Sequence, residues 1–307
     1  MSTATVFAPG TIGNVGPGFD VLGLCVDGIG DEVTVELVDA PAPVVAVTGR
    51  DAEVIPIDPT RNAAAIAAQA LLRRVGSNKH ARVSIKKGLP MSGGMGGSAA
   101  SSVGGALAAA RAWRTPVSDD DVVQAALAGE SAVAGRHLDN IAPCLLGGLS
   151  LVLSVDPVDM VRLEVKRPWW VALVSPAVRV ETKAARAVLP RSLEQHAWVK
   201  QMAHTSALVA AFSRGDAGLV RRALNDGYAE PARASLIPHF HDVKRAALGA
   251  GALGCSISGA GPTVFALAED ERGARDCASA MQRAFSDVTA TTHVGPICKS
   301  GAREVKS

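Results

Sequence analysis

The chain has 307 residues and a formal charge of +2, from 31 basic and 29 acidic side chains. Its hydrophobic content of 48% and charged content of 20% are typical of a folded protein and exclude a disordered one. The balanced charge and an aromatic content of 4% argue against nucleic acid as a partner, because they indicate neither a basic surface nor a platform for stacking bases.

The length favours two domains over one. The five cysteines are odd in number and show no CxxC spacing, so we predict reduced thiols rather than a disulfide framework or a zinc site. The N-terminal residues lack the basic and apolar regions of a signal peptide, and polar residues interrupt the alanine-rich runs before they could cross a membrane. We therefore expect a cytoplasmic protein with no membrane partner.

The N-terminal part of the chain is predicted to alternate strands and turns around one helix. Residues 3–8 form a strand that ends at Pro9, and residues 11–20 form a loop rich in glycine and proline that carries Asn14 and Asp20. These two side chains could bond their own backbone in an ordinary turn or take part in a binding site. Hydrophobic alternation and helix start signals then predict strands over 21–24, 31–38, 43–47 and 82–86 and a helix over 62–75.

The next stretch, residues 88–101, is the most informative in the chain. Four of the five residues 93–97 are glycine, which is incompatible with a strand or a helix interior. A helix of small and apolar residues is predicted directly after it, over 98–113. Free N–H groups at a helix N-terminus, where the helix dipole is positive, bind anions readily. A phosphate-binding loop is therefore predicted; the alternative, a flexible linker, would not run directly into a long apolar helix.

A further helix is predicted over 118–133, because Ser118 is a good N-cap and three aspartates follow it. This helix carries Glu130 among small apolar residues, either on its solvent-facing side or as a ligand. The loop over residues 136–143 then gathers four polar groups of different chemistry, Arg136, His137, Asp139 and Asn140. A strand follows over 149–154.

The polar segment 156–159 is the predicted domain boundary, which gives an N-terminal domain over 1–156 and a C-terminal domain over 157–307. The C-terminal domain contains a second glycine-rich stretch, residues 251–263. Its other predicted elements are strands over 169–174, 264–268 and 288–294 and helices over 192–214, 217–224, 239–249 and 272–285.

The phosphate-binding loop matches neither of the two commonest nucleotide motifs. No Lys-Ser or Lys-Thr pair follows it, as in a P-loop, and it is not a dinucleotide-binding turn. A triphosphate needs a cation, and Mg²⁺ prefers hard oxygen ligands. Ser98 and Glu130 supply a hydroxyl and a carboxylate for such an ion.

Three motifs in this order resemble those of the GHMP superfamily, the galacto-, homoserine, mevalonate and phosphomevalonate kinases. They are residues 8–20, 90–100 and 254–263. Within the superfamily, residues 14–20, 137–140 and 181–186 are similar to the homoserine kinase family in particular. One departure is Gly97, because the family usually has two serines where this chain has Gly97-Ser98.

The resemblance implies a two-domain α+β fold, with the phosphate loop in the N-terminal domain, a ferredoxin-like C-terminal domain and the active site between them. It implies ATP and Mg²⁺ as cofactors, Ser98 and Glu130 as metal ligands, a homodimer as the family habit, and a third motif that braces the phosphate loop. The implied ATP-binding residues are Asn62 and Lys87 near the adenosine and the loop residues Pro90, Met91, Ser92, Gly93, Gly94, Met95, Gly96, Gly97, Ser98, Ala99, Ala100 and Ser101.

The implied substrate, L-homoserine, carries a carboxylate, an ammonium and a primary hydroxyl. By resemblance, Arg186 and Arg233 hold the carboxylate with paired N–H donors, and Asp20 accepts the ammonium. The positions expected to add hydrogen bonds are Asn14, His137, Asn140 and Thr182. Without the family, Arg233 would be read as a surface residue and His137 as a packing residue.

The implied reaction is ATP-dependent phosphorylation of L-homoserine to O-phospho-L-homoserine, a step of threonine biosynthesis. Phosphoryl transfer needs mainly alignment and charge neutralisation, so the catalytic candidates are Ser98, Glu130 and Asp139, with the need for Asp139 as a base left open. A mevalonate or sugar kinase is the first alternative, although neither substrate explains Asp20 together with two arginines. A catalytically inactive nucleotide sensor is the second.

Overall fold

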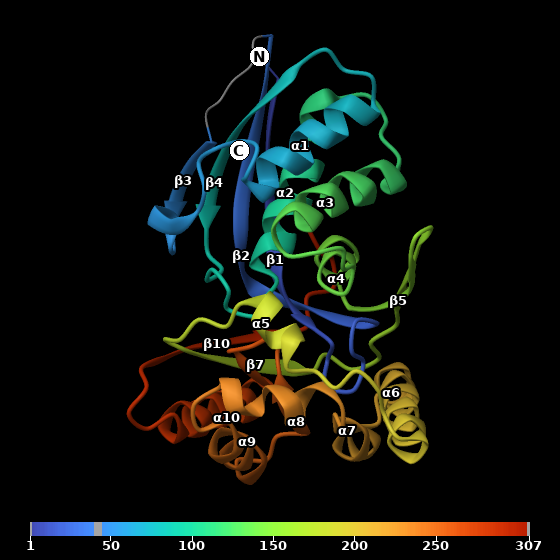
Figure 1. Cartoon of the computed structure of the whole chain (residues 1–307), viewed down its shortest axis with the longest axis vertical. Helices are drawn as coiled ribbons and strands as arrows, with labels where there is room; N and C mark the ends of the chain where they lie inside the picture. The colour runs from blue at the N-terminus through green and yellow to red at the C-terminus, as the bar shows by residue number, and fades with distance from the viewer. Residues whose placement is uncertain (1, 40–44, 306–307) are drawn as a thin grey trace.

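The computed structural model describes residues 2–39 and 45–305 and consists of two α+β units stacked along its long axis (Figure 1). The N-terminal unit is built on a seven-stranded sheet with the order β11-β1-β2-β4-β3, in which β5 pairs with β2 and β6 pairs with β5. Its strands are β1 (Thr3–Gly13), β2 (Leu22–Val38), β3 (Val45–Gly49), β4 (His80–Lys87), β5 (Leu149–Val155), β6 (Val158–Leu163) and β11 (Arg303–Glu304).

Helices cover one face of this sheet (Figure 1). They are α1 (Ala63–Arg74), α2 (Gly97–Trp113), α3 (Asp119–Val133) and α4 (Ile141–Leu146), and a 3-10 turn, η1 (Ala52–Val54), precedes them. Small residues let α2 approach closely: a Cβ on Gly105 would lie 2.2 Å from the carbonyl oxygen of Ala64 in α1. Ser118 caps α3 as predicted, since its hydroxyl accepts a hydrogen bond from the Asp121 N–H at 3.1 Å.

The C-terminal unit is built on a four-stranded antiparallel sheet with the order β10-β7-β9-β8. Its strands are β7 (Trp170–Pro176), β8 (Gly254–Ile257), β9 (Val264–Ala268) and β10 (Ala290–Pro296), and its helices are α5 (Thr182–Ala187), α6 (Gln195–Arg214), α7 (Ala217–Ala223), α8 (Ala229–Arg233), η2 (Ala234–Leu236), α9 (Phe240–Gly249) and α10 (Glu271–Ala284). Counted along the chain the strand order is 4-1-3-2, with helices after the first and third strands. This is the predicted ferredoxin-like arrangement.

Several predicted boundaries are wrong for local reasons. The first strand does not end at Pro9 but runs to Gly13, because a register shift between Pro9 and Gly10 accommodates the proline. The strands predicted over 21–24 and 31–38 are one continuous strand, β2. Residues 43 and 44 lie outside the described residues, and β3 begins at Val45. The unpredicted helices α4, α5 and α8 are too short to show a hydrophobic period.

The sequence-based boundary at residues 156 and 157 falls in the turn between β5 and β6, which pair in the N-terminal sheet. The two sheets instead divide the chain after Leu163, and β11 then returns to pair with β1, Val6 opposite Glu304. Within the described residues, no helix is both long and apolar enough to cross a membrane.

Candidate active site

The phosphate-binding loop joins β4 to α2 and has a backbone that only glycine fits at two positions. Gly94 has φ +75° and Gly96, the N-cap of α2, has φ +66°. A Cβ on Gly94 would lie 2.5 Å from the Ser258 carbonyl oxygen, and one on Gly96 would lie 2.0 Å from Thr11 Oγ1. The loop therefore delivers the N-terminus of α2, with its unpaired N–H groups, to the junction of the two units.

The C-terminal unit braces this loop, as the resemblance of its second glycine-rich stretch predicted. Ser258 Oγ donates to the Gly94 carbonyl at 2.6 Å, and the Thr263 hydroxyl donates to the Gly93 carbonyl. The Gly259 N–H donates to the Gly13 carbonyl at 3.1 Å. The phosphate loop and the end of β1 are thus held by the same turn of the other unit.

A buried ion pair grips both ends of the phosphate loop. Asp31 accepts the N–H groups of Gly88 and Leu89, at 3.0 and 3.1 Å, at the start of the loop. It also pairs with Lys87, whose Nζ donates to the Gly97 carbonyl at 3.2 Å and to Ser101 Oγ at 3.0 Å, at the end of the loop. The Lys87 ammonium, expected near the adenosine, thus has protein partners on every side.

Sequence reasoning missed Asp31, although a signal was present. Asp31 lies on the buried face of β2 together with Val33 and Val35, two and four residues further on. A charged residue in the apolar register of a strand needs a buried partner. Asn62, also expected near the adenosine, caps α1 through its Oδ1 and donates to the Pro56 carbonyl at 2.8 Å.

Ser98 and Glu130 lie side by side, as expected of a shared metal site. Ser98 Oγ donates to Glu130 Oε1 at 2.9 Å. Glu130 is only 6% exposed, so its placement on the solvent-facing side of α3 is wrong. Burial raises the pKa of Glu130 to about 7, against the lowering effect of the Ser98 hydrogen bond. Its Oε2 is buried and has no partner within residues 2–39 and 45–305, which fits a hard cation held by these two side chains.

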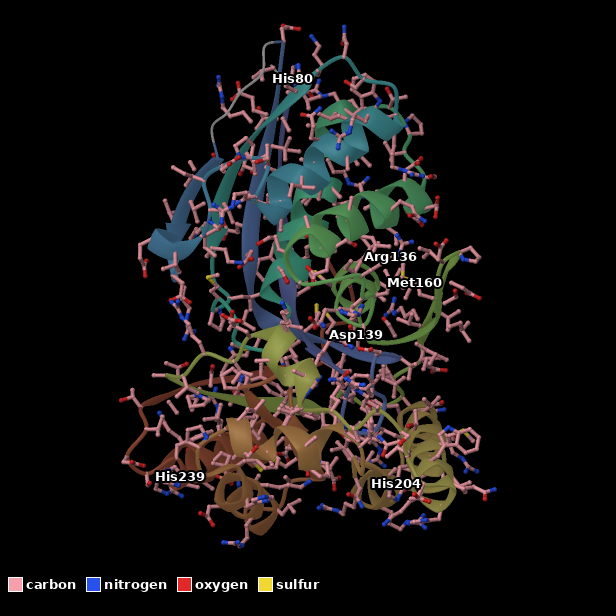
Figure 2. All side chains as sticks on the ribbon, in the orientation of Figure 1. His80, Arg136, Asp139, Met160, His204 and His239 are labelled. Atoms are coloured by element: carbon pink, nitrogen blue, oxygen red, sulfur yellow. The ribbon has the colours of Figure 1, made fainter. Side chains whose placement is uncertain are left out.

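Asp139 and Asn140 lie against the end of β1, directly before α4. A Cβ on Gly13 would lie 2.5 Å from Asp139 Oδ2 and 2.7 Å from Asn140 Nδ2. Asn140 Oδ1 accepts a hydrogen bond from Thr11 Oγ1 at 2.8 Å. Asp139 is buried at the level where the two units meet (Figure 2). Burial, with a further contribution from Asp20, raises its pKa to about 7.

The substrate residues expected from the sequence form one charged cluster. Arg186 binds Asp20 with both terminal nitrogens, at 3.0 and 2.7 Å, and approaches His137 Nδ1 at 3.3 Å. Burial, and next the positive charge of Arg186, lower the pKa of His137, so the imidazole is neutral at physiological pH. Asn14 accepts the Asp20 N–H at 3.0 Å and donates to the Gly259 carbonyl, which ties the cluster to the brace.

Arg233 is only 3% exposed, so its interpretation as a surface residue is wrong. Its Nε donates to the Ala185 carbonyl at 3.0 Å and its Nη1 to the Gly259 carbonyl at 2.8 Å. The Phe19 ring, which sequence reasoning missed, lies 5.4 Å from the guanidinium carbons of both Arg186 and Arg233.

Thr182 of the predicted substrate set is less engaged, and so is Arg136 of the polar loop, to which the sequence assigned no role. Thr182 begins α5 at a partly exposed position and makes no side-chain hydrogen bond within the described part of the chain. Arg136 is exposed and donates to the Val155 carbonyl at 3.3 Å, away from Asp139 (Figure 2). The remaining candidates converge where the phosphate loop, the loop before α4 and the second unit meet.

Comparison with known proteins agrees with this geometry. The family model for the GHMP kinases N terminal domain matches residues 62–148, and that for GHMP kinases C terminal matches residues 208–287. A homoserine kinase of Chlorobaculum tepidum is 39% identical over 323 residues, covering 100% of this chain and 99% of the relative. One of Xanthomonas campestris pv. campestris is 40% identical over 306 residues, covering 99% and 94%.

Solved structures give the same relationship. The crystal structure of homoserine kinase from Cytophaga hutchinsonii is similar with a TM-score of 0.94 and 37% identity, covering 99% of this chain and 98% of that one. Mevalonate kinase of L. major, at 16% identity and a TM-score of 0.69, shares the fold, with 94% and 95% covered. The chain therefore belongs to the GHMP kinases and, within them, to the homoserine kinases.

Proposed function

We propose that this protein is an ATP-dependent homoserine kinase, which phosphorylates L-homoserine to O-phospho-L-homoserine in threonine biosynthesis. One observation carries the proposal: the phosphate-binding loop meets a cluster of one carboxylate and two arginines, Asp20, Arg186 and Arg233, at the junction of the two units. This cluster matches the ammonium and carboxylate of an amino acid. Mevalonate lacks the ammonium and a neutral sugar lacks both charges.

The ATP phosphates bind, in this proposal, at the loop amides and the N-terminus of α2. The Lys87–Asp31 pair and the brace from Ser258 hold that loop in shape, so little reorganisation is needed when the phosphates arrive. Ser98 Oγ and the unpartnered oxygen of Glu130 would hold Mg²⁺, which supplies charge neutralisation at the phosphates when bound.

The amino acid binds between Asp20 and the two arginines, with its hydroxyl directed to the phosphate loop. Asp139 is the candidate acceptor for the hydroxyl proton. It is buried in the loop between the phosphate-binding loop and the Asp20–Arg186 pair, and its pKa of about 7 suits proton transfer at neutral pH. A base of this kind contributes about 10² to 10⁴ in rate. A loss of kcat below tenfold in Asp139→Asn would assign Asp139 an electrostatic role instead.

If Glu130 is a metal ligand, binding of the metal should release the proton of its carboxyl group. With its pKa of about 7, Glu130 is partly protonated at pH 6.5, and a bound cation requires the carboxylate. Binding of Mg²⁺ with a non-hydrolysable ATP analogue at pH 6.5 should therefore release protons, measured by calorimetry in buffers of different ionisation enthalpy. Glu130→Gln should abolish that release. Proton release equal to the wild type in Glu130→Gln would remove Glu130 from the metal site.

A coupled ADP-release assay with homoserine, mevalonate and galactose tests the activity itself. We expect turnover with homoserine only, dependent on Mg²⁺. Turnover with either other substrate would favour another GHMP kinase activity, and none with all three would favour a nucleotide sensor.

We also propose a homodimer, which the family resemblance implies, and a cytoplasmic location, which the five free cysteines support. Sedimentation of the purified protein tests the former.

A further inference from the structure

Two cysteines lie opposite each other where the C-terminal segment crosses between the two units. Val26 of β2 and Ile297 form an antiparallel bridge, and the next pair along is Cys25 and Cys298. The Cys298 N–H donates to the Cys25 carbonyl at 2.9 Å. Directly opposed residues of antiparallel strands have Cα atoms about 5.5 Å apart or closer, which is within the span of a disulfide.

The sulfur of Cys298 is surrounded by hydrogen-bond donors. Arg303 Nη1 donates to it at 3.9 Å, and hydrogen bonding from the Cys25 thiol and from the backbone of Ser300 and Gly301 lowers the pKa of Cys298. Gly301 has φ +62°, and a Cβ there would lie 2.3 Å from the Leu145 carbonyl oxygen, so glycine is required for this turn. The positive charge of Arg303 beside the sulfur favours the thiolate form of Cys298.

The Cys298 environment is unlike that of the other four cysteines. Its hydrogen bond from Cys25 is the largest cause that lowers the pKa of Cys298, to about 6, against its burial. Burial raises the pKa of each of the other thiols, Cys25, Cys144, Cys255 and Cys277. Of the five cysteines, Cys298 is thus the one whose surroundings favour the thiolate, whereas burial favours the protonated thiol of Cys25 beside it.

We propose that Cys298 and Cys25 are a redox-active pair that hydroperoxides convert reversibly to a disulfide. The Cys298 thiolate attacks one peroxide oxygen, the O–O bond breaks, and the products are the sulfenic acid of Cys298 and, after protonation, an alcohol or water. The Cys25 sulfur then displaces the sulfenic hydroxyl as water, which forms the S–S bond. The two sulfurs lose two electrons and the peroxide gains two.

One exposed side chain covers the sulfur of Cys298. The Arg303 side chain that touches Cys298 is 46% exposed, and it is held over Phe7 at 4.7 Å. Cys298 itself is 2% exposed, so its sulfur lies beneath the Arg303 side chain.

The pair is connected to the substrate loop through α4. The Cys25 N–H donates to the Gly148 carbonyl at 2.9 Å, and the Ala302 N–H donates to the Cys144 carbonyl of α4 at 2.7 Å. Asp139 and Asn140 directly precede α4 in the chain. A disulfide at residues 25 and 298 thus tethers the segment that joins the two units beside the active site.

The test treats the full-length protein at pH 7 with hydrogen peroxide, blocks the remaining thiols with an alkylating agent and maps the cysteines by mass spectrometry. We expect a Cys25–Cys298 disulfide that dithiothreitol reverses. Cys298 should be lost at least about tenfold faster than Cys255 or Cys277, because thiolates are the reactive form. In Cys25→Ser the sulfenic acid of Cys298 should persist and be trapped by dimedone, and Cys298→Ser should show neither product.

Two further variants test the proposal even if Cys25→Ser or Cys298→Ser fails to fold. Arg303→Met retains all five cysteines and should slow the oxidation of Cys298, whereas Cys277→Ser should leave it unchanged. Thermal melting under reducing conditions identifies any variant that is misfolded. Oxidation of Cys298 no faster than that of Cys255, or a disulfide from Cys298 to Cys144 in place of Cys25, would overturn the proposal.

Discussion

Arg186 holds Asp20 with both terminal nitrogens, at 3.0 and 2.7 Å, across the junction of the two units. The two residues assigned to opposite ends of the amino acid therefore satisfy each other in this structure. A zwitterion inserted between them replaces one ion pair with two: its ammonium with Asp20, and its carboxylate with Arg186 and the neighbouring Arg233. Because neither protein charge is left without a partner, the exchange avoids the cost of an uncompensated charge in a half-buried site.

The first prediction concerns this exchange. Arg186→Ala and Arg233→Ala should each weaken homoserine binding by about 2 to 5 kcal/mol, the usual effect of truncating one partner of a buried charge pair, and leave the KM for ATP nearly unchanged. The measurement is steady-state KM for both substrates. Arg222→Ala, at an exposed position, is the matched control. An unchanged KM for homoserine in both variants would refute the proposed carboxylate clamp.

The second prediction concerns Phe19, which lies against both arginines and meets the Tyr228 ring edge-on at 5.1 Å. Phe19→Leu keeps the apolar contact but removes the aromatic face. Cation–π contacts contribute about 0.5 to 2 kcal/mol, so we expect the KM for homoserine to rise roughly twofold to thirtyfold. Phe19→Tyr should stay near the wild type. Equal KM values for Phe19→Leu and wild type would mean that the ring only fills space.

The third prediction is a pH effect on stability. The pKa of Asp139 is about 7 in the fold, against 3.8 for a free carboxyl, so the folded protein binds this proton more tightly than the unfolded chain. The resulting stability is complete below about pH 4 and is lost as the pH rises to 7. Asp139→Asn, which cannot ionise, should therefore gain stability over the wild type on the order of 2 kcal/mol more at pH 8 than at pH 5.

Urea denaturation of both proteins at the two pH values measures this difference. Asp159→Asn, at an exposed position of β6, should show no comparable pH dependence. The same stabilisation of Asp139→Asn at pH 5 and pH 8 would contradict a protonated Asp139 in the fold. If Asp139→Asn is more stable than the wild type but has a lower kcat, the Asp139 carboxylate lowers the stability of the fold and serves the reaction.

The sequence predicted those parts of the site that follow from local chemistry. Four glycines before an apolar helix predicted the phosphate loop. The capping residue Ser118 and the start signal before residue 62 predicted the helices over 118–133 and 62–75. The preference of Mg²⁺ for hard oxygen ligands paired Ser98 with Glu130. The family motifs assigned Asp20 and Arg186 to the same substrate, and the ferredoxin-like C-terminal unit came from the same resemblance.

The parts that the sequence did not predict depend on distant contacts. The apolar register of β2 marks Asp31 as buried, but its partner Lys87 is identified only once the neighbouring strand is in place. Phe19 is recognisable only once two arginines from α5 and α8 flank it. The return of β11 to the first sheet has no signal at all, because a strand of two residues has no period. The division after Leu163 was not predicted because the turn between β5 and β6 is rich in the residues that also occur in domain linkers.

The fourth prediction concerns the ion pair behind the phosphate loop. Lys87→Met leaves the buried Asp31 without its cation and should lower the free energy of unfolding by about 3 to 5 kcal/mol. Where the variant is folded, the KM for ATP should rise, because the Gly97 carbonyl and Ser101 lose a common donor. Lys86→Met, the exposed neighbour paired with Glu32, should cost less than about 1 kcal/mol.

The double variant Asp31→Asn with Lys87→Met separates the two effects. It removes the uncompensated charge, so stability should partly return while the KM for ATP stays raised. If the folded Lys87→Met protein binds ATP as tightly as the wild type, the ion pair stabilises the unit but does not shape the loop.

The fifth prediction compares two glycines of the loop. A Cβ on Gly97 would point to the back of the loop, 3.2 Å from the Pro90 carbonyl oxygen and 3.8 Å from Lys87 Nζ. The serine that the family usually carries there should therefore bond these groups, and Gly97→Ser should change the KM for ATP by less than about threefold, under 1 kcal/mol. A Cβ on Gly94, with φ +75°, would instead lie 2.5 Å from the Ser258 carbonyl oxygen.

Gly94→Ala should accordingly displace the brace and lower kcat/KM for ATP at least tenfold, since a left-handed residue and a backbone clash coincide. Steady-state kinetics on the two variants decides between two views of the loop. If Gly97→Ser lowers the KM for ATP fivefold or more, a side-chain hydroxyl reaches the phosphates and this chain has lost a contact that its relatives keep. If only Gly94→Ala has an effect, the backbone and the helix dipole are sufficient, and the residue at 97 is free to vary.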